Sequence, residues 1–261
     1  MEQDNSSAKT PAILMRDVTV GALNDPATAV LRDVNWEVRP GDFWVLAGLQ
    51  GEGKSDLLML TAGLMPPLAG EYLFFGEPMP IFDEARLPHR LRLGLVFETG
   101  QLFNQLTVRE NVALPLCYHR NLSQSEAAPT VQTLLDQMEL GPWADSTPGS
   151  LGRNWHKRVG LARALILKPD ALLLDNPLGG LDLRHVYWWL HFLQQLSKGS
   201  STLRPEPITL VATTADLRPW MEPGEKFGIV KNQTLNVVGS RAQVEAAKRE
   251  LVGELMAPIA Q

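Results

Sequence analysis

The chain has little of several features that would have pointed to other classes of protein. It contains one cysteine, Cys117, among 261 residues, which excludes an internal disulfide framework and fits a reducing compartment. No apolar run approaches the ~20 residues that a membrane-spanning helix needs. The polar first residues also lack the basic start and apolar middle of a secretion signal. The formal net charge of −5 leaves no basic excess, so we expect no nucleic-acid partner. These absences together predict a soluble cytoplasmic protein.

A glycine-rich segment between an apolar run and a helical pattern is the most specific feature present. Residues 48–55 follow Phe43–Ala47 and read Gly-Leu-Gln-Gly-Glu-Gly-Lys-Ser. This is the strand, loop and helix order of the phosphate-binding P-loop, G-x-x-x-x-G-K-[ST]. The glycines let backbone N–H groups surround phosphate oxygens, and the positive end of the following helix faces them.

The P-loop predicts a site for a nucleoside triphosphate with Mg²⁺. Lys54 would reach the β and γ phosphates, and the Ser55 hydroxyl would take one Mg²⁺ position. The expected nucleotide-binding residues are Gly48, Leu49, Gln50, Gly51, Glu52, Gly53, Lys54, Ser55 and Asp56. The carboxylates of Glu52 and Asp56 add negative charge beside the cradle, which should weaken anion binding unless Mg²⁺ screens it.

Strand-length apolar runs alternate with helical patterns along the rest of the chain, which predicts an α/β fold around a parallel sheet. The expected core strands are Trp44–Ala47, Leu93–Phe97, Ala171–Asp175, Ile208–Thr213 and Phe227–Val230. Antiparallel strands are expected at Ile13–Val20, Val34–Val38 and Tyr72–Phe75. We expect a tail at 1–11, one domain at 12–240 with a helical subdomain inserted at roughly 98–168, and a terminal helix and tail at 241–261.

A second motif decides between the classes of P-loop protein. The apolar run Ala171–Leu174 ends in Asp175, and an aspartate placed there beside the P-loop strand would hold the Mg²⁺ together with Ser55. With these two elements in place, the chain resembles the ATP-binding subunit of an ABC transporter over roughly Ile13 to Gly239. Further matching segments are Gly41-Asp42, Ala62-Gly63-Leu64, Leu106-Thr107-Val108, Glu110-Asn111-Val112, Leu161-Ala162-Arg163-Ala164-Leu165 and Gly180-Leu181-Asp182.

The resemblance implies a P-loop NTPase fold with a RecA-like core, an antiparallel β subdomain and an inserted helical subdomain. It also implies ATP and Mg²⁺ as ligands, and head-to-tail pairing, as a homodimer or a heterodimer, on integral membrane permease subunits. The protein would then lie on the cytoplasmic face of the inner membrane. The stretch 97–103, with the segment after it, is most similar to the ATPases of bacterial lipid-asymmetry (MCE-type) transporters, which suggests a lipid or hydrophobic substrate.

Two departures from the family fall next to the expected Mg²⁺ site. The glutamate that activates water in the family is replaced by Asn176, and the glutamine of the Q-loop is replaced by Glu98. A neutral amide can hydrogen-bond water without taking its proton. Loss of a general base typically costs about 10²–10⁴-fold in rate. The Glu98 change is milder, because a carboxylate also ligates Mg²⁺.

Other departures affect the groups that close on the γ-phosphate. The family signature Leu-Ser-Gly-Gly-Gln, which contacts the nucleotide of the paired subunit, is replaced by Leu151, Gly152, Arg153, Asn154 and Trp155. The switch histidine is assigned to Thr214, which has no cationic form. The D-loop aspartate is retained as Asp182.

We therefore expect an ATP-binding transporter subunit with weak or absent hydrolysis. A different interpretation is a non-catalytic regulatory or structural partner that uses the same fold. A further one is an active ATPase in which another group, such as Glu98, activates water.

Overall fold

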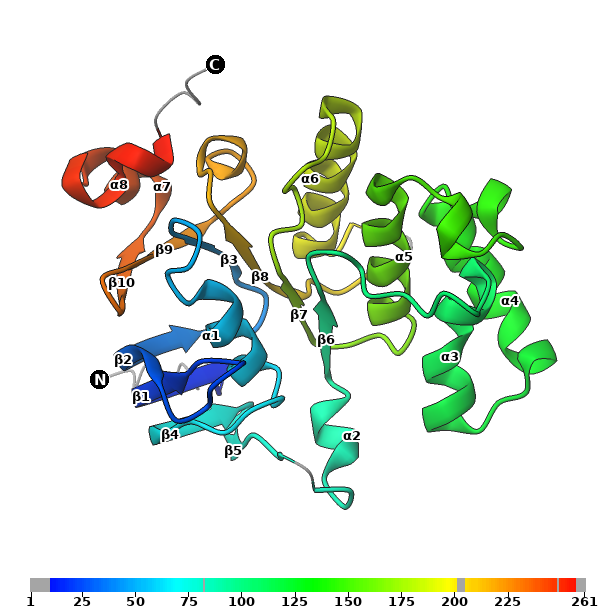
Figure 1. The fold of residues 1–261 in the computed structure, drawn as a ribbon, viewed down its shortest axis with the longest axis horizontal. Helices are drawn as coiled ribbons and strands as arrows, with labels where there is room; N and C mark the ends of the chain where they lie inside the picture. The colour runs from blue at the N-terminus through cyan, green and yellow to red at the C-terminus, as the bar shows by residue number, and fades with distance from the viewer. Residues whose placement is uncertain (1–9, 82, 201–204, 248, 257–261) are drawn as a thin grey trace, which may run out of the picture.

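Two β-sheets and a block of helices make up the chain (Figure 1). The computed structural model describes residues 10–81, 83–200, 205–247 and 249–256. Most of the tail expected at 1–11, and the last residues of the terminal segment expected at 241–261, lie outside this part. Within the described residues, no helix is long and apolar enough to cross a membrane.

The larger sheet carries the P-loop strand at its centre. Its strands lie in the order β10-β9-β3-β8-β7-β6. Their bounds are Thr234–Gly239 (β10), Lys226–Lys231 (β9), Phe43–Ala47 (β3), Thr209–Thr214 (β8), Ala171–Leu174 (β7) and Leu93–Val96 (β6). All neighbouring pairs are parallel except β10 with β9. The carboxyl ends of β3, β7 and β6 therefore meet at one edge, where the P-loop, Asp175 and Glu98 follow.

Side chains of the central strand alternate between two separate cores. Val45 belongs to the core formed with the helices on one face of the sheet. Trp44 and Leu46 belong to the core on the other face, with helix α1 (Lys54–Thr61) and the second sheet. Strands that bury both faces read as continuous apolar runs, which is why Phe43–Ala47 shows no polar alternation.

The second sheet is antiparallel and packs beside α1. Its order is β2-β1-β4-β5. The bounds are Ala29–Val38 (β2), Ile13–Gly21 (β1), Ala69–Phe74 (β4) and Glu77–Pro78 (β5). Buried and exposed residues alternate along β2, as expected for a strand with one face toward solvent.

Helices fill the interval between β6 and β7. After the short helix α2 (Leu87–Arg90), which precedes β6, come α3 (Val108–Arg120), α4 (Gln124–Gln137) and α5 (Arg153–Leu165). Both α3 and α4 start with a capping box, Thr107 with Glu110 and Ser123 with Glu126, which satisfies N–H groups that have no partner inside the helix. Figure 1 shows α5 between the β6 edge and the outlying pair α3 and α4.

The remaining helices cover the same face of the larger sheet as α5. Helix α6 (Leu183–Ser197) follows β7, and helices α7 (Arg241–Ala246) and α8 (Arg249–Met256) follow β10. The Leu217 backbone N–H donates to the Leu255 carbonyl at 3.0 Å, and Val252 and Leu255 are buried in the core that contains Ile229. The last helix is therefore anchored beside the P-loop end of β9.

The expected α/β architecture is confirmed, and every expected strand is present with shifts at its ends. Strands β5 and β10 were not anticipated. Helix α5 starts at Arg153 with Gly152 as its N-cap, so the last three altered signature residues form the first turn of a helix.

Candidate functional site

The P-loop forms the junction between β3 and α1. Gly51 and Gly53 have φ of 87° and 92°, in the left-handed region that favours glycine. Gly53 is the N-cap of α1, so the loop turns sharply and leaves the first N–H groups of the helix directed toward the loop interior. This is the backbone geometry that an anion cradle requires.

Lys54 lies over this cradle. Its Nζ donates to the carbonyl oxygens of Gly48 and Leu49, both at 2.7 Å. Burial lowers the pKa of the Lys54 ammonium group, and the nearby carboxylates, Asp175 first, oppose that shift. The cavity around it measures about 230 Å³ and is lined by Gln50, Gly51, Gly53, Lys54, Ser55, Asp56, Glu98, Asp175, Asn176, Thr213 and Ala215.

The two P-loop carboxylates that were expected to weaken anion binding are both held by backbone groups. Glu52 Oε2 accepts from the Asn232 N–H at 3.0 Å. Asp56 Oδ1 accepts from the Leu23 N–H at 2.8 Å. These contacts tie Glu52 to the β9–β10 turn and Asp56 to the β1–β2 loop, while Asp56 still lines the cavity.

Ser55 and Asp175 come together as the sequence predicted for a Mg²⁺ site. Ser55 Oγ donates to Asp175 Oδ1 at 2.9 Å, and Thr213 Oγ1 donates to the same oxygen at 2.9 Å. Burial raises the pKa of the Asp175 carboxyl, and the hydrogen bonds from Thr213 and Ser55 oppose that rise. A hydroxyl and a carboxylate facing a phosphate cradle are the oxygen ligands that Mg²⁺ prefers, so the residues present fit the ion.

Asn176 and Glu98, the two departures nearest this centre, contact each other. Asn176 Nδ2 donates to Glu98 Oε1 at 2.6 Å. Asn176 has φ of 41°, and its backbone N–H donates to Thr213 Oγ1 at 2.9 Å. The carboxylate beside the Mg²⁺ site thus comes from the end of β6, and the amide comes from the end of β7.

The loop that carries Glu98 is fixed against α5. A Cβ added at Gly100 would lie 2.4 Å from the His156 carbonyl oxygen, and one added at Gly160 would lie 3.0 Å from the Gly100 Cα. Arg163 Nη2 also donates to the Gly100 carbonyl at 2.9 Å. Glycines are needed at both positions because the two backbones are in contact.

Lys157 is a site residue that the sequence interpretation missed. It is 7% exposed, and its Nζ donates to the carbonyl oxygens of Asn176 at 2.9 Å and Gly179 at 2.7 Å. Burial lowers the pKa of its ammonium group, while the charges of Glu98 and Asp175 oppose this. The sequence pattern alone assigned no role to Lys157, and only its position between the signature residues and a buried helix face could have indicated one.

Thr214, the expected switch position, is not among the residues that line the cavity. Thr214 is 4% exposed, and its hydroxyl donates to the Asp216 carbonyl at 2.9 Å and accepts from the Asp216 N–H at 3.1 Å. The residues of this strand end that line the cavity are Thr213 and Ala215. Side chains alternate along a strand, so the position facing the phosphates after Thr213 is Ala215, which has no polar group.

The signature residues lie outside the cavity and contact the D-loop. Gly152 is the N-cap of α5, and Leu151 is buried while Arg153 is exposed. Asn154 Nδ2 donates to Asp182 Oδ2 at 2.8 Å. Hydrogen bonds from the His185 N–H and ring lower the pKa of the Asp182 carboxyl. The retained aspartate is therefore held within its own chain by a residue that replaces a signature glycine.

Trp155 and its neighbours form a packed cluster beside this contact. The Trp155 ring meets His185 edge to face at a centroid distance of 5.2 Å. The guanidinium of Arg158 lies 4.7 Å from the Trp155 ring centre and 3.8 Å from that of Trp188. Arg158 also pairs with Glu139 at 2.8 Å, so the bulky signature residue is part of the helical core.

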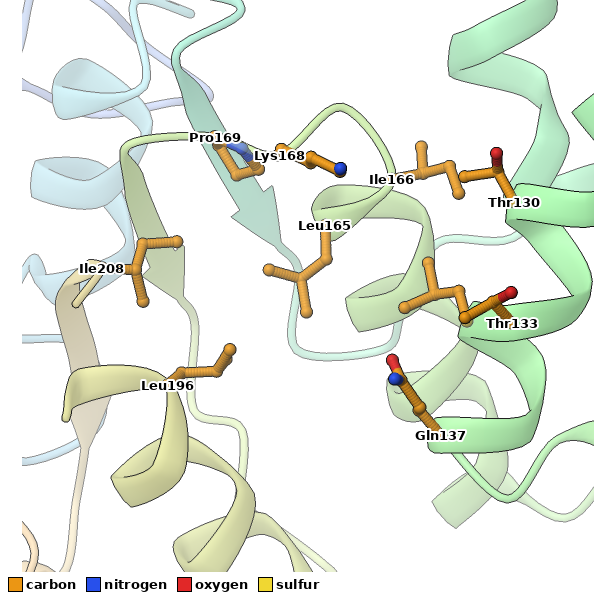
Figure 2. A pocket seen from close by; sticks show the side chains of 10 residues that line it. Thr130, Thr133, Gln137, Leu165, Ile166, Lys168, Pro169, Leu196 and Ile208 are labelled. Atoms are coloured by element: carbon orange, nitrogen blue, oxygen red, sulfur yellow. The ribbon is translucent and has the colours of Figure 1, made fainter. Parts of the chain in front are cut away.

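A second cavity of about 250 Å³ lies between α4, the end of α5 and the end of α6. Figure 2 shows mainly apolar side chains around it, among them Leu165, Leu196 and Ile208, with the polar ends of Thr133 and Gln137 contributed by α4. Its lining contains no carboxylate and no glycine-rich loop. Its lining thus lacks the carboxylates and the glycine-rich loop of the phosphate site.

Comparison with known proteins decides the family. The family model described as ABC transporter matches residues 31–179, which span β2, the P-loop, the helical block, Asp175 and Asn176. The chain belongs to the ABC transporter family.

Named relatives of this ABC domain differ in what they are described as handling. The chain is 31% identical over 218 residues, 83% of its own length, to the spermidine/putrescine import ATP-binding protein PotA of Trichodesmium erythraeum, of which it spans 54%. It is 32% identical over 179 residues, 67% of its length, to the lipoprotein-releasing system ATP-binding protein LolD of Francisella tularensis, of which it spans 76%. The chain therefore covers only about half of the polyamine-import relative.

A solved structure supports the fold of the ABC domain. An ATP-binding cassette, determined as a dimer in a post-hydrolysis state with ADP and Pi, superposes with a TM-score of 0.75 and 27% identity. The superposition covers 85% of this chain and 96% of that one.

Proposed function

We propose that the protein is the ATP-binding subunit of an ABC transporter, and that it binds Mg·ATP and hydrolyses it slowly. The observation that carries the proposal is the combination of the Ser55–Asp175 contact at 2.9 Å with an amide at position 176. The Ser55–Asp175 contact provides the centre that would bind Mg²⁺. Asn176 stands where the family has its general base, and Ala215 offers no polar group at the end of β8.

Two such domains would close around nucleotide and act on membrane permease subunits at the cytoplasmic face of the inner membrane. ATP would stabilise the closed pair because it binds that state more tightly. Slow hydrolysis or nucleotide release would reopen it. This mode of action suits a gate or a slow transporter better than a rapid pump.

The transported molecule is proposed to be a lipid or another hydrophobic compound. The support is the similarity of residues 97–103 to lipid-asymmetry ATPases, together with a relative that is described as lipoprotein-releasing. Specificity in such systems lies in the membrane subunits, so co-purification of the permease and analysis of its bound molecules by mass spectrometry tests this part.

The function is tested by binding and turnover measured on the same preparation. Lys54→Ala should weaken Mg·ATP binding about 10- to 100-fold, as expected for loss of charge-assisted hydrogen bonds worth about 1.5–3 kcal/mol. Binding should also weaken when Mg²⁺ is removed. Steady-state phosphate release should be well below the ~1 s⁻¹ at the lower end of common enzyme rates.

The control is Lys198→Ala, which removes an exposed lysine at the end of α6 and should leave binding unchanged. If the Lys54→Ala variant bound Mg·ATP as tightly as the wild-type protein, the P-loop would be vestigial, and the structural-partner interpretation would be favoured. Turnover at or above ~1 s⁻¹ would contradict slow hydrolysis.

A further inference from the structure

The carboxylates that line the phosphate cavity differ in what they contact. Asp56 accepts the Leu23 N–H, and Asp175 accepts hydroxyl hydrogen bonds from Ser55 and Thr213. Glu98 is exposed, and within the described part of the chain only the Asn176 amide donates to it, at Oε1. Its Oε2 accepts no hydrogen bond from the described residues, so it can accept one from a molecule in the cavity.

The amide that contacts Glu98 is itself firmly held. The Asn176 N–H donates to Thr213 Oγ1, and the Asn176 carbonyl accepts from the buried Lys157 at 2.9 Å. A Cβ added at Gly179 would lie 2.3 Å from Asn176 Nδ2, so the backbone closes over the amide from one side. A fixed donor 2.6 Å from one oxygen of a carboxylate orients the other oxygen.

We propose that Glu98 is the catalytic carboxylate of the slow hydrolysis and that Asn176 is its positioning residue. Two neighbouring positions have thereby exchanged a carboxylate and an amide, and the acidic group reaches the same cavity from β6 instead of β7. This inference rests on the proposed function, because it requires that Mg·ATP binds at the P-loop.

The chemical step needs only ATP and water. The water oxygen forms a bond to the γ-phosphorus while the bond from that phosphorus to the β–γ bridging oxygen breaks, and ADP leaves with that electron pair. The proton of the water passes to the Glu98 carboxylate. Asn176 cannot accept this proton because a neutral amide is not a base at physiological pH, and Asp175 is placed beside Ser55 as a Mg²⁺ ligand.

The experiment compares kcat with Mg·ATP affinity in a set of variants. Glu98→Gln keeps the shape of the side chain and should lower kcat about 10²- to 10⁴-fold, with the ATP dissociation constant changed by less than about threefold. Asn176→Ala should lower kcat by a smaller factor without changing affinity. Glu225→Gln, at an exposed carboxylate before β9, is the matched control.

The exchanged variant Glu98→Gln/Asn176→Glu separates catalysis from packing. It returns one carboxylate and one amide to the pair with their places reversed, and should recover at least about tenfold over Glu98→Gln alone. The single variant Asn176→Glu should have a lower kcat than the double variant, because its two carboxylates, at positions 98 and 176, would face each other. Because the exchange places a glutamate where the family has its general base, recovery would show that the pair needs one carboxylate, and the loss in Glu98→Gln alone would show that Glu98 supplies it in this chain.

The outcomes are distinct. Glu98→Gln turnover within about twofold of the wild-type rate, with Mg·ATP still bound, would overturn this inference alone. A wild-type protein that binds Mg·ATP and releases no phosphate would overturn this inference and the slow hydrolysis of the proposed function, and would leave only the nucleotide-binding part standing. Absence of Mg·ATP binding by the wild-type protein would overturn the proposed function and this inference with it.

Discussion

Lys157 joins two parts of the site that are distant in sequence. It projects from α5, two positions beyond the signature tryptophan, and donates to the carbonyls of the loop that follows Asp175. Its pKa is lowered by burial, so keeping the ammonium charged there has a cost. The carbonyl contacts offset that cost and hold Asn176 in its left-handed conformation, which makes Lys157 a structural determinant of the Asn176–Glu98 contact.

Replacing this lysine should therefore destabilise the domain. Lys157→Met keeps most of the side-chain length but leaves buried carbonyl oxygens without a donor, a loss of about 1–3 kcal/mol in the free energy of unfolding. The loss of stability should lie toward the lower end of this range, because the variant no longer has to bury a charged group. Urea unfolding gives the measurement, and Lys198→Met at an exposed site is the control. An unchanged urea midpoint would show that the carbonyls find other partners.

Loop 97–101 is positioned by close backbone packing on α5. Gly100 has φ of 78° and lies against the His156 carbonyl, and Gly160 provides the space on the helix side. Such contact leaves no room for a methyl group, so Glu98 is placed by the packing of its loop as much as by its own hydrogen bond.

Gly100→Ala should disturb both stability and turnover. The new methyl group would have to displace the loop, and the positive φ is unfavourable for alanine, so we expect a loss of about 1–3 kcal/mol. Phosphate release should fall because Glu98 moves, whereas the P-loop itself is untouched. Gly149→Ala is the matched control, since a Cβ there meets nothing within 4 Å. Thermal unfolding and steady-state turnover are measured for both variants. The same unfolding temperature and turnover for Gly100→Ala and Gly149→Ala would show that the loop adapts to the methyl group.

The sequence predicted the elements of the fold where burial on both faces left a continuous apolar run, as in Phe43–Ala47 and Ala171–Leu174. It failed at β10, because Thr234–Gly239 is an edge strand with no fully buried residue. The turn before it uses Asn232 and Gln233 at positive φ, without the glycine that usually marks such a hairpin.

In the site, as in the fold, the sequence indicated features that depend on neighbouring residues, but not contacts between distant ones. Ser55 and Asp175 were predictable because each stands at the end of a recognisable strand or loop. The sequence does not show which of Thr214 and Ala215 faces the cavity, and in the structure it is Ala215 that lines it. The Asn176–Glu98 contact joins positions that are far apart in the chain, so only the sheet order could bring them together.

At the scale of the whole molecule, slow hydrolysis should be visible as a long-lived pair. If a second copy completes the site, Mg·ATP should shift the mass measured by light scattering from that of a monomer to that of a dimer. ADP should not do so, and Lys54→Ala should remain monomeric. A mass that stays monomeric with Mg·ATP bound would show that a different ABC subunit, and not a second copy, is the partner.

The sandwich of Arg158 between Trp155 and Trp188 has a practical consequence. Indole emission responds to nearby charge, so any movement of the signature segment relative to the guanidinium or to His185 would change the fluorescence of Trp155. The chain has seven tryptophans, and a difference spectrum against Trp155→Phe would isolate this one. The protein thus carries a built-in optical reporter of the signature segment.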